Sequence, residues 1–141
     1  MANHANTPLE ALSLASLAPQ DPIAPNFRFY ELTLSELASR LGVKNSFPGD
    51  REMRAAVNLA RNVLQPIRKH YGSFTPNSVF RGQELERVLK RKPSGWLSTS
   101  QHTQGCACDL EIVARSTLQV ARWAANHLPE YDQIICECYD P

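Results

Sequence analysis

The sequence lacks several features that would assign the chain to a broad class at once. Glycine is scarce, with 6 residues in 141, and aromatic residues make up only 8%. No apolar run approaches the ~18 residues that a membrane-spanning helix needs, so we expect no membrane partner. Residues 1–19 have neither a basic start nor a sustained apolar segment, which argues against a secretory signal peptide.

The chain also lacks an excess of charge of either sign. Lys and Arg number 15 against 14 Asp and Glu, so the formal net charge is +1. This balance offers no electrostatic basis for binding nucleic acid or an anionic membrane. Apolar residues make up 43%, which is enough to build a core, and 141 residues suit one domain.

The first 26 residues differ in composition from the rest of the chain. They are rich in Ala, Pro, Asn and Ser, and prolines interrupt them at positions 8, 19, 22 and 25. This composition favours an extended arm over a short helix across residues 9–17. We expect residues 1–26 to be a flexible terminus, or else an arm that docks onto virion or cell-wall proteins, ahead of a domain over residues 27–141.

Patterns of apolar and capping residues predict four helices. They cover residues 33–42, 50–71, 83–90 and 116–128. The first and the last open with the spacing of a capping box, formed by Thr33 with Glu36 and by Ser116 with Gln119. Gly42 suits the end of the first helix, and Pro129 ends the last.

The second of these helices should be long and amphipathic. Asp50 suits its start and Gly72 its end. Apolar side chains recur along it at helical spacing: Met53, Ala56, Val57, Ala60, Val63, Leu64 and Ile67. Pro66 should kink it, because proline lacks the backbone N–H and clashes with the preceding turn.

Strand patterns come later in the chain, over residues 78–80, 106–113 and 131–139. The order predicts an α+β fold, in which helices pack on one face of a small, mainly antiparallel sheet. Side chains alternate along a strand. If the last two strands pair, Asp109 and Glu137 share one face, and the thiols lie on the other.

The four cysteines form two Cys-x-Cys pairs, Cys106 with Cys108 and Cys136 with Cys138. Reduced thiols buried under the sheet are the interpretation we favour, because small cysteines suit a core. A disulfide between neighbouring strands and a zinc site made of four thiolates are the alternatives. The spacing is narrower than the C-x2–4-C of most structural zinc sites.

The segment SQHTQGCACD, over residues 100–109, is the richest in reactive groups. Its His102 lies at the end of a loop, and its Asp109 follows seven residues later. An imidazole and a carboxylate that converge can bind one zinc ion. Gly105 between them allows a tight turn, although this spacing alone is a weak signal.

This segment resembles the S-x-H-x-x-G-x-A-x-D signature of the zinc D-Ala-D-Ala-type peptidases, an M15A-like family of phage and bacterial enzymes. A branch of that family carries further motifs in the same order, and each has a counterpart here. The counterparts are LTLSEL at 32–37, NLARNVLQPIR at 58–68, SVFR at 78–81 and YDQIICE at 131–137. The resemblance runs from about residue 28 onward and implies a Hedgehog-like fold.

The resemblance also implies roles for particular residues. His102 and Asp109 would be two of three zinc ligands. Arg81 would hold substrate or stabilise developing negative charge. Ser100 would support the His102 loop and the substrate, and Glu137 would be a general base. The implied reaction is zinc-assisted hydrolysis of a peptide bond in the stem peptides of bacterial peptidoglycan.

The chain departs from the family pattern in three places. The family's third ligand is a His in a terminal W-x-H strand, and this chain ends at Pro141 without one. A Gly-Gly turn is replaced by KRKP at 90–93, and Cys106 and Cys108 occupy small-residue positions. We therefore expect either a truncated peptidase or a domain that kept the fold and lost the metal.

Several other residues have simpler interpretations. His4, His70 and His127 read as surface or helix-end residues, which leaves the third ligand unassigned. Trp96 and Trp123 read as packing residues. Residues 90–92 read as a solvated basic loop.

Two of the implied site residues have simpler alternatives as well. Arg81 could instead form a surface ion pair with Glu84 or Glu86. Glu137 could be an ordinary exposed strand residue.

Two functions from different classes follow. The first is a zinc peptidase that acts on peptidoglycan and is encoded by a phage or a bacterium. The second is a structural module of the same fold, associated with a virion or cell wall and held by residues 1–26. A domain built around a four-thiolate zinc is a third, weaker alternative. Without a signal peptide, we expect the protein in the virion or the cytoplasm of an infected bacterium.

Overall fold

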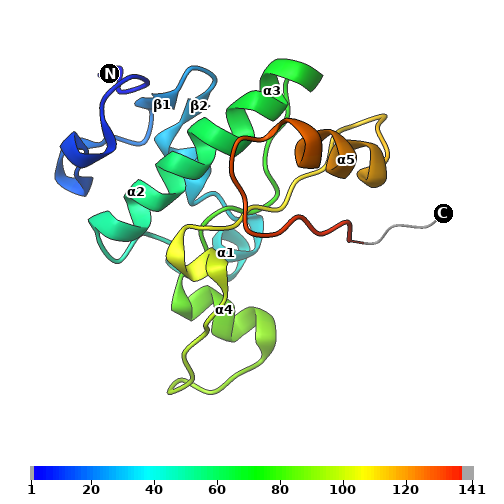
Figure 1. Ribbon diagram of the computed structural model, residues 1–141. Coiled ribbons are helices and arrows are strands. Elements are labelled where there is room, and N and C mark those ends of the chain that lie inside the picture. Colours follow the sequence, from blue (N-terminus) through cyan, green and yellow to red (C-terminus); the bar gives the residue numbers. More distant parts are fainter. Residues whose placement is uncertain (1, 138–141) are drawn as a thin grey trace.

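A long helical rod runs through the middle of the molecule (Figure 1). The structure is a computed structural model that describes residues 2–137. The rod consists of α2 (Asp50–Leu59), a π-helical turn (Ala60–Leu64) and α3 (Gln65–Tyr71). Gly49 precedes it in an extended conformation, and Asp50 is its first residue rather than its cap.

The apolar stripe predicted for this rod is confirmed as the centre of the core. Met53, Ala56, Val57, Ala60 and Leu64 are completely buried. The kink expected at Pro66 takes the form of the π-helical turn just before it, where Gln65 N–H bonds Ala60 O five residues back. Proline at this point supplies no N–H to the regular helical ladder, and the wider turn carries the helix past it.

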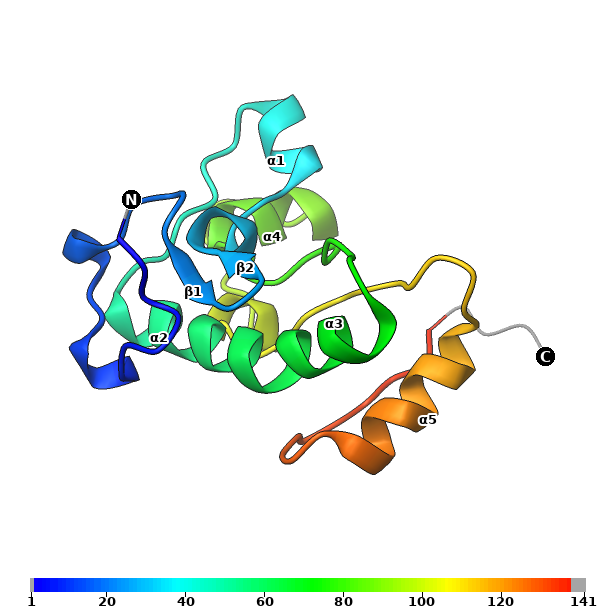
Figure 2. The same ribbon diagram turned by 90° about the horizontal axis from the view of Figure 1, so that it is seen from above.

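The N-terminal segment differs from the detached arm that its composition favours. Leu12 and Ile23 are completely buried against the rod, in the main core. Arg61 on the rod donates hydrogen bonds of 2.7 Å to the carbonyl oxygens of His4, Thr7 and Ile23. Residues 2–26 thus lie alongside the rod (Figure 2). They pack on the domain itself because scattered apolar side chains between the prolines join the main core.

Short elements shape this segment. Two 3-10 turns, Leu9–Ala11 and Leu14–Ser16, flank the buried Leu12. They lead to the antiparallel pair of β1 (Pro22–Ala24) and β2 (Phe27–Arg28), and a third 3-10 turn, Phe29–Leu32, follows. The α+β class with a small antiparallel sheet is confirmed, but this sheet lies early in the chain.

The prediction of three late strands was wrong. Residues 78–80 and 106–113 meet only at one antiparallel bridge, between Ser78 and Asp109. Residues 131–137 are irregular, and 138–139 lie outside the described residues. A strand needs a partner along its whole length. Here the chain passes the 77–78 segment at one point and then turns toward the helix that begins at Thr117, so within residues 2–137 no late sheet with a helical layer forms.

The remaining helices agree with the predicted ranges. They are α1 (Glu36–Leu41), α4 (Gln83–Lys90) and α5 (Thr117–His127). Ser116 caps α5 as expected, whereas Ser35 rather than Thr33 caps α1. None of the helices within residues 2–137 combines the length and the apolar character that a bilayer crossing requires.

Helix α5 packs on α3 through a second, smaller core. Its buried members are Ile67, Ile112, Val120, Ala124 and Leu128. At its edge the Trp123 ring stacks between the rings of His70 and His127, at centroid distances of 4.5 and 4.8 Å. Trp123 is therefore a packing residue, as the sequence suggests.

The burial of Leu12 makes a first prediction. Leu12→Ala should lower the free energy of unfolding by about 2–4 kcal/mol, because it opens a cavity between the N-terminal segment and the rod. Urea denaturation measures the change. Leu97→Ala, at a side chain that is 70% exposed, is the matched control and should cost less than about 0.5 kcal/mol. Equal effects of the two substitutions would contradict the packing described here.

Gly105 makes a second prediction. It has a positive φ of 75°, and a Cβ there would overlap the backbone carbonyl oxygen of Glu52 in α2. Gly105→Ala should therefore destabilise the protein by about 1–3 kcal/mol in thermal or urea unfolding. Gly95, whose Cβ would meet open space, should tolerate alanine within about 1 kcal/mol. An unchanged midpoint for Gly105→Ala would mean that this close approach does not exist.

Candidate functional site

His102 lies on a short 3-10 turn, Gln101–Gln104, that is packed against α2. The hydroxyl of Ser100 caps this turn by accepting a hydrogen bond from His102 N–H at 3.2 Å. The ring is nearly buried, and its Nδ1 lies 2.7 Å from the carbonyl oxygen of Val79. Since a carbonyl only accepts, Nδ1 carries the proton, and in the neutral ring Nε2 keeps its lone pair.

Asp109 is brought to this ring by the bridge to Ser78. Its N–H donates to Ser78 O at 2.8 Å, and its carbonyl oxygen accepts from Asn77 N–H at 2.8 Å. The carboxylate Oδ2 then lies 3.5 Å from His102 Nε2. His102 and Asp109 thus lie side by side, through a single bridge and the turn at Gly105 rather than through a paired strand.

The pair has the chemistry of two zinc ligands. Two ligand atoms at ~2.0–2.2 Å from a tetrahedral ion are separated by about 3.4 Å, close to the 3.5 Å observed here. The bond from His102 Nδ1 to Val79 O is the outer-shell contact that metal-bound histidines commonly make. Within residues 2–137, however, no third His, Cys, Asp or Glu completes a metal-binding group.

Arg81 lies beside the pair, fixed at several points. Its backbone N–H donates to His102 O at 3.1 Å. In the side chain, Nη1 lies 3.5 Å from Asp109 Oδ2 and 3.4 Å from Ser78 Oγ. Nε lies 3.1 Å from Glu86 Oε2, so the alternative of an ion pair with Glu86 is also present, although it is an interior pair rather than a surface one.

Glu86 is the residue whose importance the sequence did not reveal. It is a completely buried carboxylate that accepts from Lys90 Nζ at 2.9 Å and from Ser98 Oγ at 2.7 Å. Burial opposes its ionisation, but the Ser98 and Lys90 hydrogen bonds and the Arg81 charge outweigh this, so its pKa is lowered. The sequence does contain one indication of this ion pair, because Glu86 lies four residues before Lys90 on the same predicted helix and directly follows the apolar Leu85.

Residues 90–92 are exposed, as expected for a solvated basic segment, although Lys90 is the last residue of α4 rather than part of a loop. Lys90 pairs with Glu86, and both Lys90 and Lys92 lie over the ring of Trp96, at 5.9 and 5.5 Å from its centroid. The pair forms because Lys90 and Glu86 lie four residues apart on α4. Arg87 donates to Trp96 O and completes the contact of the loop with the helix.

Glu137 does not lie on the strand that was predicted to carry it, since residues 131–137 are irregular. It is exposed and joins no metal-binding group with His102 and Asp109 within the described residues.

The thiols divide into different environments. Cys106 is exposed, which contradicts a buried position, whereas Cys108 packs against the main core. Cys136 is partly buried, with Sγ 3.4 Å from Thr117 Oγ1, and Cys138 lies outside the described residues. The three described cysteines are free thiols. The common thiol face was expected from the alternation of side chains along a strand, but residues 106–113 do not form a strand.

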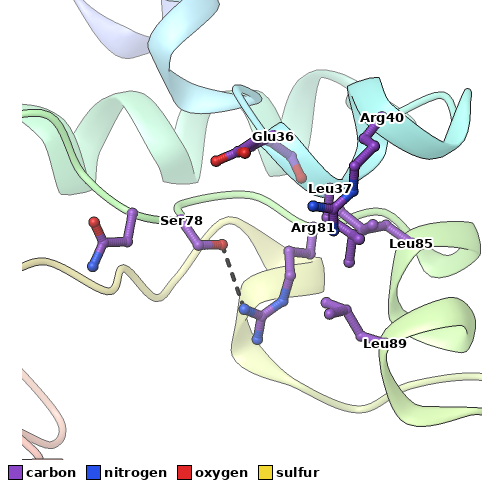
Figure 3. A pocket seen from close by; sticks show the side chains of 9 residues that line it. Glu36, Leu37, Arg40, Ser78, Arg81, Leu85 and Leu89 are labelled. Carbon is purple, nitrogen blue, oxygen red and sulfur yellow. Dashed lines mark hydrogen bonds between the residues drawn. The ribbon is translucent and has the colours of Figure 1, made fainter.

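An open cleft of about 320 Å³ lies between α1 and α4, next to this site (Figure 3). Leucines from both helices line it, together with the polar side chains of Arg81 and Ser78. Figure 3 shows Arg40 and Glu36 of α1 at this cleft as well. The side chain of Arg81 therefore both lines the cleft and contacts Asp109.

The environments of Cys106 and Cys108 make a third prediction. Burial, with the Asp109 charge second, raises the pKa of Cys108 to about 12. Near pH 8 only about one Cys108 in ten thousand is thiolate, the form that reacts. Iodoacetamide applied to the folded protein should alkylate Cys106 and spare Cys108, as read by peptide mass spectrometry. Chain unfolded in urea is the control, in which both should react; rapid native labelling of Cys108 would contradict the assignment.

One comparison with known proteins identifies the family. The family model described as peptidase M15 matches residues 25–137, which is most of the chain and includes Arg81, Ser100, His102 and Asp109. Neither a search of curated proteins nor a search of solved structures finds a match. The family expected from the ordered motifs is thereby confirmed, and the chain belongs to the peptidase M15 family.

Proposed function

We propose that this chain is a zinc-dependent peptidase that cleaves stem peptides of bacterial peptidoglycan and is encoded by a phage or a bacterium. The observation that carries the proposal is the separation of 3.5 Å between His102 Nε2 and Asp109 Oδ2. Membership of the peptidase M15 family supports the reaction class. The peptide substrate is supported by the resemblance of the His102 segment to the D-Ala-D-Ala-type peptidases.

The residues of the site have separate roles in this proposal. His102 and Asp109 hold the zinc ion, with the His102 ring fixed by Val79 O. Zinc bound here would polarise the scissile carbonyl and make a water molecule more acidic. Arg81, whose positive charge lies beside Asp109, stabilises the negative charge that develops on the carbonyl oxygen. Ser100 keeps the His102 turn in place.

The cleft between α1 and α4 is where we expect part of the peptide to lie. It is open, it has leucines from both helices, and Arg81 and Ser78 connect it to the His102 and Asp109 pair. Among the described residues, Arg40 at this cleft forms no ion pair, so its charge is available for a peptide carboxylate. The lining thus combines leucines with two cationic side chains, Arg40 and Arg81, and one carboxylate, Glu36.

A second candidate function is a structural module of the same fold. One observation favours it: residues 2–137 supply two zinc ligands, whereas catalytic zinc usually has three protein ligands. Such a module would associate with other virion or cell-wall proteins. Its contacts would have to use surfaces other than the apolar side chains of residues 2–26, since Leu12 and Ile23 are covered by the rod.

Zinc binding and cleavage by matched variants separate these functions, and this is a fourth prediction. The full chain, stripped with a chelator, is titrated with zinc and then incubated with purified peptidoglycan, and released peptides are measured by mass spectrometry. We expect bound zinc and new peptides. His102→Ala should weaken zinc binding at least about tenfold and abolish cleavage, because it removes the neutral nitrogen ligand.

His127→Ala is the control, because His127 is exposed and its contacts among the described residues are with the carbonyl oxygen and the ring of Trp123. It should leave zinc and cleavage unchanged. Zinc that survives His102→Ala but is lost on Cys108→Ala would point to the thiolate site instead. A folded chain with neither zinc nor cleavage would favour the structural module and end the peptidase proposal.

A further inference from the structure

The buried carboxylate of Glu86 accepts hydrogen bonds from three side chains near the candidate site, those of Arg81, Lys90 and Ser98. Its side chain is fully covered, while Glu84 on the same helix is exposed. Oε2 accepts from Arg81 Nε at 3.1 Å, and Oε1 accepts from Lys90 Nζ at 2.9 Å and Ser98 Oγ at 2.7 Å. A buried charge persists only with such compensation, so these contacts constrain both sides of the group.

A directed chain of hydrogen bonds leads from Glu86 to the backbone of His102. An ionised carboxylate only accepts, so the Ser98 hydroxyl donates to Glu86, and its oxygen accepts from Ser100 N–H at 3.1 Å. The Ser100 hydroxyl in turn accepts from His102 N–H at 3.2 Å. Each donation runs toward the carboxylate, which is the final acceptor, and Glu86 thereby fixes which way the Ser98 proton points.

The second oxygen of Glu86 orients Arg81. The guanidinium is planar and rigid, so holding Nε fixes where Nη1 points. Nη1 lies 3.5 Å from Asp109 Oδ2 and 3.4 Å from Ser78 Oγ. Lys90 provides the charge that balances the cluster: Arg81 and Lys90 carry two positive charges against those of Glu86 and Asp109.

We propose that Glu86 is a positioning residue, which sets Arg81 and the His102 turn in register through its two carboxylate oxygens. The inference rests on the proposed function of the His102 and Asp109 site and deepens it. Glu86 contacts Arg81, Lys90 and Ser98, so it acts on the site through Arg81 and through the Ser98–Ser100 segment. Packing alone would be served by an apolar side chain of similar size, and at lower desolvation cost.

The Arg81 branch is tested with Glu86→Gln, which keeps the shape and removes the charge. The readout is the NMR signal of Arg81 Nε–H, assigned by its loss in Arg81→Lys. We expect this signal to move to the position of a solvent-exposed arginine in Glu86→Gln and to stay unchanged in the control Glu84→Gln. With stem peptide as substrate, kcat should fall about ten- to a hundredfold while KM changes less than about threefold, because the substrate still binds but Arg81 is misdirected.

The His102 branch is tested separately with Ser98→Ala. This variant should shift the NMR signals of the His102 ring and leave the Arg81 Nε–H signal in place, since only the Ser98 branch is cut. Lys90→Met removes the ammonium group that pairs with the Glu86 carboxylate. It should move neither the Arg81 Nε–H signal nor the His102 ring signals substantially. This pattern would show that two branches diverge from Glu86. If Glu86→Gln does not fold, Ser98→Ala and Lys90→Met still provide the comparison.

Two results would overturn the proposal. One is an Arg81 Nε–H signal and a kcat that stay unchanged in folded Glu86→Gln. The other is a Ser98→Ala chain with unshifted His102 signals. The NMR measurements need no turnover, so a chain without peptidase activity would refute the proposed function while the positioning role of Glu86 is still decided by them.

Discussion

Burial of one apolar stripe along the rod of residues 50–71 is the interaction on which the rest of the structure depends. The N-terminal segment covers the stripe on one side through Leu12 and Ile23. Val79 and Phe80 belong to the same core, and the turn that carries His102 rests on α2 where Gly105 approaches the backbone of Glu52. The site is thus assembled on the rod, because each segment that contributes to it buries apolar or backbone surface there.

Polar groups decide the geometry of the site within that framework. Val79 O holds the His102 ring, Ser78 holds the backbone of Asp109, and the backbone N–H of Arg81 holds His102 O. These bonds join residues 78–81 to residues 102 and 109 without a continuous sheet. A few well-placed hydrogen bonds, backed by the core, therefore replace the strand pairing that the sequence suggested.

The family match covers most of the chain, but the candidate metal site within the described residues is incomplete. The chain belongs to the peptidase M15 family, and His102 Nε2 lies 3.5 Å from Asp109 Oδ2, whereas no third metal-binding side chain joins them within residues 2–137. The same chain carries a dense group of charges around Arg81 and Glu86. The group includes the buried carboxylate of Glu86, whose charge is compensated by hydrogen bonds from Arg81, Lys90 and Ser98.

Helices and their ends were predictable because they depend on local sequence. The stripe from Met53 to Ile67, the cap at Ser116 and the stop at Gly72 all follow from side chains within a few residues of one another. The ordered motifs also established the family, and the pairing of His102 with Asp109 followed from the motif that contains both.

Strands, burial and long-range partners were decided only by the tertiary structure. Residues 106–113 alternate like a strand, yet only Asp109 finds a partner, because β pairing requires a second segment that the chain must place alongside. The same holds for Glu86, which looks like any helix-surface acid until Arg81, Lys90 and Ser98 surround it. Composition suggested a free terminus for residues 2–26, but whether Leu12 is covered depends on the rod that it meets.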